Sequence, residues 1–428
     1  MTWQKTYAGV LERLDAEIAN ARLTLCGLSA CVDATVSLHD AGALFAPTGD
    51  AEAERFAGML RERAAAGIGG EIKVDWLGGP AWLDERVPFV RALGGTGPHA
   101  ARVLTTLGAP ALLALETRSA EQLAVLDPEI RVARDGRSVP AKTIQPDHPN
   151  AIKTYIFEYT KGRPIGSVLP PRSSRIIVRF DDPGLQNDRD FEQLSCRLAP
   201  QAGAAILSGF NTVGVAALGP TLARTRKLAQ RWAAAGVPAI HFELAGYARP
   251  EYRDAAMREL TGCATSFGLS FSEFAALVPN SDLAAGMRAL GERLQVRRVC
   301  VHADDWAAAA TLDDPARERD ALLLGSLLAS TRAAHGRPVV PRALPAGAAF
   351  GEPPRVPEAL GEWRIAVCST PYLAQPVTTL GLGDTFMAGC LLVLGQQHSP
   401  LPPAGYRPDP RAARLPAAPF AYDRTDTQ

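Results

Sequence analysis

Residues 379–385 read Thr-Leu-Gly-Leu-Gly-Asp-Thr and lead directly into the apolar run Phe-Met-Ala-Gly-Cys-Leu-Leu of residues 386–392. This order predicts a glycine-rich turn that opens a buried helix. Glycines let the backbone come close to a ligand, and the unpaired amides at a helix start attract anions such as phosphate. A carboxylate in that turn, Asp384, would lie beside a transferred phosphoryl group and could accept a proton from an attacking hydroxyl. The alternative is that Asp384 serves only as an N-terminal helix cap.

The composition is that of a folded chain whose net charge does not favour binding to a polyanion. The 428 residues are 47% hydrophobic and 21% charged, which is enough for one α/β unit with an elaboration or for two domains. Lys plus Arg and Asp plus Glu number 45 each, so no basic field exists to hold nucleic acid or an anionic membrane. The seven cysteines include one close pair, Cys26 and Cys31, and indicate reduced, buried thiols. We therefore expect small-molecule partners.

The N-terminal segment, residues 1–22, carries several charges within an amphipathic helical pattern and lacks the apolar core and cleavage site of a secretory signal. No other segment is long and uncharged enough to span a bilayer. We expect a cytoplasmic protein that is a monomer or a small homo-oligomer.

Short aliphatic runs alternate with longer stretches of helical periodicity, which is typical of parallel strands joined by crossover helices. We expect strands at residues 23–28, 111–115, 176–180, 204–208, 237–242, 298–302 and 364–368. We expect helices at residues 97–107, 220–235, 250–261, 281–294, 314–333 and 384–394. The alternation predicts an α/β fold with a doubly wound, mostly parallel sheet flanked by helices.

Two regions, residues 34–90 and 138–172, interrupt this alternation. The second contains Lys-Thr-Tyr-Ile-Phe-Glu-Tyr at residues 153–159, an alternating aromatic pattern that favours an exposed strand. We interpret both regions as parts of a smaller, discontinuous β-rich lid on a core formed by residues 1–33, 91–137 and 173–395. Residues 396–428 are rich in Pro, Ala and Arg and are expected to form a weakly ordered tail.

Further short elements occur in a characteristic order along the chain. They are Cys-Val-Asp-Ala at 31–34, Gly-Gly-Thr-Gly at 94–97, Tyr-Ile-Phe-Glu-Tyr at 155–159, Leu-Ser-Gly-Phe at 207–210, His-Phe-Glu-Leu-Ala at 241–245 and Val-His at 301–302. Together with residues 379–385, they resemble the ADP-dependent glucokinase and phosphofructokinase family of the ribokinase-like superfamily. The resemblance implies a ribokinase-like fold and transfer of a phosphoryl group from a nucleotide, ADP, to a hydroxyl of a sugar or sugar phosphate, with Mg²⁺ as cofactor.

The resemblance implies that Asp33 and the turn of Gly94, Gly95 and Thr96 bind the acceptor sugar. Asp33 follows the first strand, at the end where open α/β sheets bind their ligands, and a carboxylate suits vicinal hydroxyls. A solvated turn residue is the alternative for Asp33. The family often has Gln where this chain has Thr96, which leaves the identity of the sugar open.

Two further acceptor contacts are implied for the lid. Glu71, which follows two glycines, loosely matches a family Glu that reaches the sugar; the alternative is a surface Glu in a glycine loop. Thr154 stands where the family tends to have a His. Nearby Lys153, Lys161 and Arg163 would bind a phosphate on the acceptor or form a solvated basic edge that discourages aggregation.

Two acidic elements match the family's metal site. Glu243, in the His-x-Glu element, is the first choice to hold Mg²⁺, which needs only one or two carboxylates besides substrate phosphates; the alternative is that it caps the following segment. Glu273 lies in Ser-x-x-Glu at 270–273, where Ser270 replaces a family Asn. Glu273 could equally complete a helix capping box.

The remaining implied roles concern the transferred phosphate and the nucleotide. Gly381 and Gly383 form the catalytic turn with Asp384, and Leu382 and Gly383 would contact the nucleotide. His302, at the end of a strand, borders the nucleotide or simply hydrogen-bonds within its loop.

The residues themselves leave two other functions open. An ATP-dependent sugar or nucleoside kinase of the same fold would show the same motifs. The departures at Thr96, Thr154 and Ser270 also fit a catalytically weak protein that binds a sugar or nucleotide for regulation, although Asp384 and Glu243 argue against loss of activity.

Overall fold

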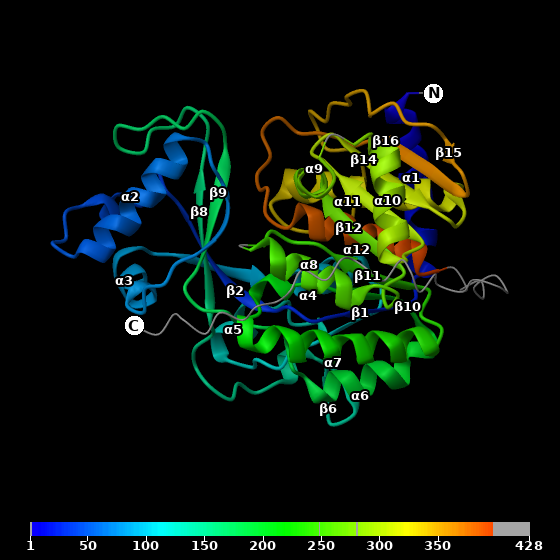
Figure 1. Ribbon diagram of the computed structural model, residues 1–428, viewed down its shortest axis with the longest axis horizontal. Coiled ribbons are helices and arrows are strands. Elements are labelled where there is room, and N and C mark those ends of the chain that lie inside the picture. Colours follow the sequence, from blue (N-terminus) through cyan, green and yellow to red (C-terminus); the bar gives the residue numbers. More distant parts are fainter. Residues whose placement is uncertain (1, 248, 280, 397–428) are drawn as a thin grey trace.

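The structure is a computed structural model that describes residues 2–247, 249–279 and 281–396 (Figure 1). Its larger sheet has eleven strands in the spatial order β15-β16-β14-β13-β12-β11-β10-β1-β5-β6-β7. From β13 to β6 all neighbours are parallel, and the strands at both edges are antiparallel. In chain order the strands are β1 (Leu23–Cys26), β5 (Ala111–Leu113), β6 (Arg131–Arg134), β7 (Arg137–Pro140), β10 (Ala202–Leu207), β11 (Ala239–Glu243), β12 (Ser266–Ser270), β13 (Arg298–His302), β14 (Trp306–Thr311), β15 (Ala359–Leu360) and β16 (Trp363–Ser369).

Helices cover both faces of this sheet. One face packs against α1 (Trp3–Ala19), α4 (Thr96–Leu107), α11 (Pro315–His335) and α12 (Leu382–Leu394). The other packs against α6 (Arg189–Leu198), α7 (Val215–Ala234), α8 (Pro250–Leu260), α9 (Phe271–Leu277) and α10 (Leu283–Leu294). Successive residues of a strand pack into the hydrophobic cores on opposite faces of the sheet, because side chains alternate across a strand. Leu25 and Cys26 of β1 are an example. The predicted doubly wound, mostly parallel α/β sheet is confirmed.

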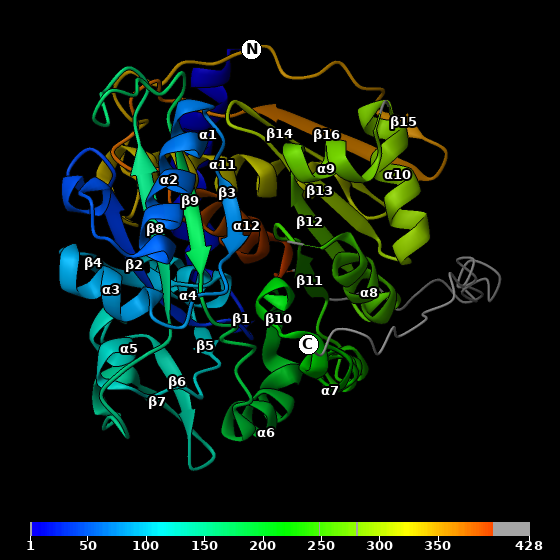
Figure 2. The same cartoon turned by 60° about the vertical axis from the view of Figure 1, so that its left-hand side comes forward.

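A smaller five-stranded sheet lies beside the larger one, at the left of Figure 1, and Figure 2 brings it forward. Its strands, in the order β3-β9-β8-β2-β4, are β2 (Cys31–Ser37), β3 (Gly70–Lys73), β4 (Val90–Gly94), β8 (Lys153–Tyr159) and β9 (Ser174–Arg179). The helices α2 (Ala51–Ala65) and α3 (Gly79–Arg86) accompany it, and α5 (Ala120–Val125) lies near β2 and β4. Its own hydrophobic core is rich in aromatic rings, with Phe56 and Trp76 at its centre.

One expectation about the strands is wrong, and several strands were not predicted. The run at 176–180 was expected in the larger sheet, but β9 pairs with β3 and β8 of the smaller one, because an aliphatic run alone does not specify its partner. The strand β14 was missed because it reads Trp-Ala-Ala-Ala-Ala-Thr, and alanine is depleted in strands. The short strands β6, β7, β12 and β15 were missed as well.

The predicted helices are present, with one shifted start. Helix α7 begins at Val215, five residues before the Pro220 that we took as its first residue. Among the described residues, no helix combines the length and apolar character needed to cross a membrane. The predicted tail lies outside the described residues, except for Gln396.

Helix α12 is packed closely against α11, and two glycines make this possible. A Cβ placed on Gly389 would lie 2.8 Å from the Cα of Gly325, and one placed on Gly325 would lie 2.5 Å from the carbonyl oxygen of Phe386. Every residue of α12 from Thr385 to Leu394 is buried. The close approach therefore fixes where this helix begins.

We expect Gly325→Ala to lower the free energy of unfolding by about 1–3 kcal/mol, because the added methyl group overpacks the contact between the two helices. Urea unfolding of the purified protein measures this change. Gly58→Ala in α2 is the matched control, since a Cβ there meets nothing within 4 Å and the substitution should stabilise by roughly 0.5–1 kcal/mol. Equal effects of the two substitutions would contradict the proposed packing constraint.

Candidate functional site

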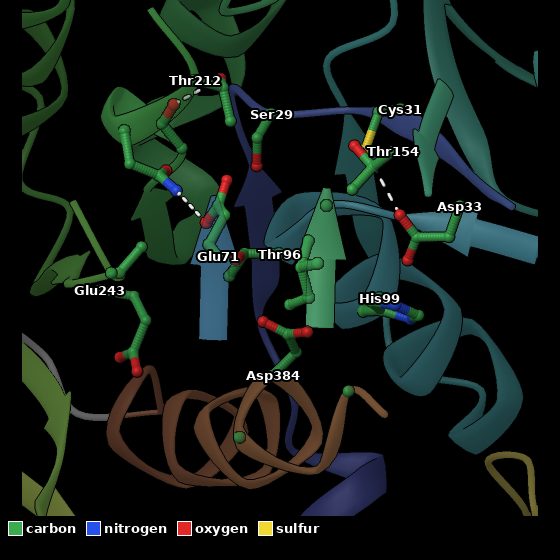
Figure 3. Close-up of a pocket in the computed structure, with 18 of the residues that line it drawn as sticks. Ser29, Cys31, Asp33, Glu71, Thr96, His99, Thr154, Thr212, Glu243 and Asp384 are labelled. Atoms are coloured by element: carbon green, nitrogen blue, oxygen red, sulfur yellow. Dashed lines mark hydrogen bonds between the residues drawn. The ribbon is translucent and has the colours of Figure 1, made fainter. Parts of the chain in front are cut away.

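A cavity of about 380 Å³ lies between the carboxyl ends of the core strands and the smaller sheet (Figure 3). Segments that follow β1, β10, β11 and β12 line it, together with the starts of α4 and α12, and this is the edge where open α/β sheets bind ligands. The predicted residues that line it are Asp33, Glu71, Gly95, Thr96, Thr154, Glu243, Glu273, His302, Gly381, Gly383 and Asp384.

Two predicted residues do not line the cavity within the described part of the chain, Gly94 and Leu382. A Cβ on Gly94 would collide with the carboxylate of Asp33, so this glycine makes room for Asp33. Leu382 begins helix α12, and the cavity wall is formed by Leu380 on the other side of Gly381.

Asp384 lies in the first turn of α12, while Gly381 is the N-cap residue. Gly381 has a φ of 67°, a left-handed conformation that favours glycine, and no side chain caps this helix. The capping alternative for Asp384 is therefore wrong. Burial raises the pKa of Asp384, whereas Arg332 and a hydrogen bond with Thr96 act to lower it.

Asp33 belongs to β2, lines the cavity and is only 6% exposed. Burial, reinforced by repulsion from Asp384, raises its pKa to about 8. The thiol of Cys31 donates a 3.8 Å hydrogen bond to Oδ1 of Asp33 and opposes this rise. The solvated-turn alternative for Asp33 is wrong, because β2 buries it.

Glu243 ends β11 and is held by two histidines. Its Oε2 lies 2.7 Å from Nε2 of His241, and its Oε1 lies 3.4 Å from Nε2 of His302. Burial alone would raise the pKa of Glu243, but these hydrogen bonds outweigh it and lower the pKa to about 2. Glu243 is therefore a fixed anion in the cavity, and the pKa of His302 is raised in turn by its contact with Glu243 despite burial.

Glu273 both caps a helix and lines the cavity. The capping box is present: Ser270 Oγ accepts from the amide of Glu273, and Oε2 of Glu273 accepts from the amide of Ser270 at 2.8 Å. Burial raises the pKa of Glu273, and the hydrogen bonds from Ser270 oppose this. The second carboxylate oxygen, Oε1, is not used by the capping box.

The donor set fits a magnesium ion that takes most of its ligands from substrate and water. No group of three or more His, Cys, Asp or Glu side chains that could hold a metal by itself occurs in the described ranges. Glu243 and Glu273 nevertheless come from adjacent strand ends and face the same cavity. One or two carboxylates are sufficient for Mg²⁺ when phosphates supply the other oxygens.

The smaller sheet contributes a polar wall that the sequence motifs revealed only in part. Glu71 accepts a 2.8 Å hydrogen bond from Asn211 and forms an ion pair with Arg179. Arg175 of β9 donates a 3.1 Å hydrogen bond to Oγ1 of Thr379, which links the smaller sheet to the segment that leads into α12. Thr154 donates to Cys31 Sγ at 3.8 Å.

The basic residues considered for an acceptor phosphate are engaged elsewhere. Lys153 pairs with Asp84 at 2.7 Å, and Arg163 pairs with Asp40 at 3.1 Å. Neither these two nor Lys161 is among the described residues that line the cavity. The arginines in the cavity wall are Arg175 and Arg179.

Several residues of the site were missed by the sequence argument. Arg175, Arg179 and Asn211 line the cavity, as does His99 of α4, and Arg332 of α11 lies just behind the catalytic turn. Most of these side chains lie inside strands and helices. Arg175 and Arg332 have no neighbouring glycine in the sequence, whereas Asn211 directly follows the Leu-Ser-Gly-Phe element at 207–210 and could have been included with it.

Comparison with known proteins identifies one family. The family model described as the ADP-specific phosphofructokinase/glucokinase conserved region matches residues 24–393. No curated protein sequence matches the chain.

Solved structures of similar shape include three of this kind. An ADP-dependent kinase in complex with fructose 6-phosphate and ADPβS has a TM-score of 0.75 and 18% identity, covering 92% of this chain and 98% of that one. A last common ancestor of ADP-dependent phosphofructokinases from Methanosarcinales has a TM-score of 0.70 and 17% identity over 93% and 99% of the two chains. A phosphofructokinase from Pyrococcus horikoshii OT3 with AMP has a TM-score of 0.69 and 18% identity over 87% and 97%. At these identities the likeness shows a shared fold.

The environment of Asp33 predicts an unusual dependence of stability on pH. The folded protein keeps this proton up to about pH 8, whereas the unfolded chain loses it near the ordinary pKa of 3.8. Raising the pH through this window therefore removes stability, because the native state binds more protons than the unfolded state. Between about pH 5 and pH 8, we expect the parent to lose about 1–3 kcal/mol relative to Asp33→Asn in urea unfolding.

The control is Asp50→Asn, since exposed Asp50 caps α2 and Asn caps equally well. It should follow the parent at both pH values. If the parent and Asp33→Asn show the same pH dependence, the buried, protonated state of Asp33 is refuted.

Proposed function

This chain belongs to the ADP-specific phosphofructokinase/glucokinase family and is an ADP-dependent sugar kinase, and we propose that its cavity moves the terminal phosphoryl group of ADP to a hydroxyl of a sugar or sugar phosphate, with Asp384 as general base. The observation that carries the proposal is the position of Asp384. Its half-buried carboxylate stands in the first turn of α12 and faces the cavity that Asp33 also lines.

The proposed step is an in-line displacement at the β-phosphorus of ADP. The acceptor hydroxyl gives its proton to the carboxylate of Asp384, and its oxygen forms a bond to the β-phosphorus. The bond from that phosphorus to the bridging oxygen breaks, and AMP leaves with the electron pair. A carboxylate that accepts the proton in the transition state contributes roughly 10²–10⁴-fold to such a rate.

The start of α12 offers amides to the transferred group. The first amide that bonds within the helix is that of Thr385, which donates to the carbonyl of Gly381 at 3.0 Å. The amides before it, from Gly381 to Asp384, are the ones that a helix start leaves unpaired. Together with the helix dipole they would stabilise negative charge on the phosphoryl oxygens.

The other residues of the cavity have complementary proposed roles. Asp33 accepts hydrogen bonds from acceptor hydroxyls, with Gly95, Thr96 and Thr154 beside it. Glu243 and Glu273 would hold Mg²⁺, which when bound supplies positive charge against the phosphate oxygens. We also propose that the smaller sheet, contributed by the segments around residues 34–90 and 138–172 and by β9, acts as a lid that excludes water during transfer.

Replacing Asp384 with Asn tests the base. We expect kcat with ADP and Mg²⁺ to fall by at least about 100-fold, because the amide cannot accept the proton. The assay measures AMP formation on a panel of hexoses and hexose phosphates that includes glucose and fructose 6-phosphate.

The matched control is Asp282→Asn, since Asp282 caps α10 at the surface and Asn keeps the cap. It should retain parental turnover. An Asp384→Asn variant within about tenfold of the parent would refute the base assignment.

Replacing Glu243 with Gln tests the metal-binding role. We expect the Mg²⁺ concentration for half-maximal activity to rise roughly 10- to 100-fold, because the fixed negative charge is lost while the side chain keeps its size. Magnesium titration of the rate measures this, with Glu292→Gln at an exposed position of α10 as the control. An unchanged magnesium requirement would argue against Glu243 as a metal residue.

A further inference from the structure

Behind the catalytic turn lies a buried arginine that the reaction scheme above does not use. Arg332 belongs to the last turns of α11 and is 5% exposed. A Cβ on Gly381 would collide with its guanidinium, so the turn lies directly against this cation.

The guanidinium is held by neutral partners. Its Nη1 donates a 2.9 Å hydrogen bond to Thr385 Oγ1, and Thr385 Oγ1 in turn donates to the carbonyl of Gly381 at 2.8 Å. Its Nη2 lies 3.2 Å from Nδ1 of His99. The chain of contacts therefore runs from Arg332 through Thr385 to the residue that caps α12.

The charge of Arg332 is not neutralised by a direct ion pair. Across residues 2–247, 249–279 and 281–396, no carboxylate lies within ion-pair distance of it, and its Nε has no hydrogen-bond partner. Burial lowers the pKa of Arg332, and the acid that opposes this is Asp384. Burying a cation without a paired anion is costly, which points to a role other than stability.

The imidazole ring of His99, which contacts Arg332, is also affected by burial and by this charge. Burial, reinforced by the charge of Arg332, lowers its pKa well below the usual value, so the ring is neutral. Because a guanidinium only donates, Nδ1 of His99 must accept, and the ring proton lies on Nε2. The cation thus fixes the tautomer of a residue in the cavity wall.

We propose that Arg332 is a positioning residue for phosphoryl transfer, which holds the Gly381–Asp384 turn through Thr385 and favours the ionised carboxylate of Asp384. This inference rests on the proposed role of Asp384 as the base. Arg332 touches neither the acceptor nor the phosphate in this scheme. It acts on the groups that do.

The electrostatic part of the proposal depends on every charged group near Asp384. Glu243 from β11 repels its ionised form, and His302 from β13 favours it, while Asp33 from β2 keeps its proton up to about pH 8. From α4, Thr96 donates a hydrogen bond and His99 is neutral. Arg332 from α11 is the leading charge that lowers the pKa of Asp384 against burial.

The test is the pH profile of kcat at saturating ADP, Mg²⁺ and acceptor, with AMP measured directly. At saturation, kcat reports the pKa of the base in the substrate complex. We expect Arg332→Met to move the acid limb to higher pH by about one unit, since removing a nearby opposite charge raises the pKa of a carboxylic acid. At pH values below the acid limb, kcat should therefore be about tenfold lower than in the parent, and at pH values above it the loss of kcat should be smaller.

Two further variants separate charge from shape. Arg332→Lys should keep the acid limb near its parental position while lowering kcat, because it keeps the charge and loses the fixed fork that meets Thr385 and His99. If Arg332→Met does not fold, Arg332→Gln replaces it, since it keeps a donor and removes the charge. The same upward shift is expected.

Arg317→Met is the matched control. Arg317 lies on the same helix, pairs with Glu17 at 3.1 Å and donates to the carbonyl of Val393 at the far end of α12. It is outside the cavity, so its loss should leave the acid limb unmoved. A shift of equal size in this variant would show a general effect of loosening α12 and overturn the proposal.

The double variant Arg332→Met with Asp384→Asn separates this inference from the proposed function. If Arg332 acts through Asp384, the double variant should be no more than about twofold slower than Asp384→Asn alone. An acid limb that stays in place in Arg332→Met, while Asp384→Asn is inactive, overturns the inference and leaves the base assignment intact. Near-parental activity of Asp384→Asn overturns both.

Discussion

The position of the site depends on the burial of one helix. All of α12 from Thr385 onwards is buried, and glycines at 325 and 389 let it lie against α11 without space between the backbones. A helix enclosed in this way cannot slide or rotate without opening the core, because interiors are close-packed. Its first turn, with Asp384, is therefore held at the edge of the sheet where the strands β1, β10, β11 and β12 end. The two arginines of α11 that touch it, at 317 and 332, hold its opposite ends.

Part of this arrangement could be predicted from the sequence and part could not, and the difference between the two parts has a physical reason. Residues such as Asp33 and Glu243 follow aliphatic runs, so the parallel topology alone brings them to one edge. The glycines around Asp384 indicate a turn, because glycine adopts backbone conformations that other residues avoid. Three residues that the sequence argument missed lie inside strands or helices: Arg175, His99 and Arg332. A single sequence does not show which part of the protein each face of a strand or helix packs against. The strand β9 shows the same limit, since its aliphatic pattern predicts a strand and leaves its sheet undetermined.

Three of the carboxylates that line the cavity, Asp33, Glu243 and Asp384, have different environments, and this separates their chemistry. Glu243 receives hydrogen bonds from two histidines and stays ionised. Asp33 receives only a weak thiol contact, and burial makes it hold its proton up to about pH 8. Burial raises the pKa of Asp384, and Arg332 and a hydrogen bond with Thr96 act against this rise. Groups with pKa values pushed apart in this way can act as fixed anion, ligand and base in one site.

If Asp33 binds the acceptor and Asp384 is the base, as proposed above, the repulsion between them would couple acceptor binding to base strength. In the free protein, Asp33 keeps its proton and therefore adds no negative charge near Asp384. Acceptor hydroxyls that donate to Asp33 favour its ionised form, because hydrogen bonds to a carboxylate lower its pKa. An ionised Asp33 would then raise the pKa of Asp384 and make it a stronger base in the proposed reaction. The charge of Arg332 acts against this rise and favours the ionised form of Asp384, which the proposed reaction needs.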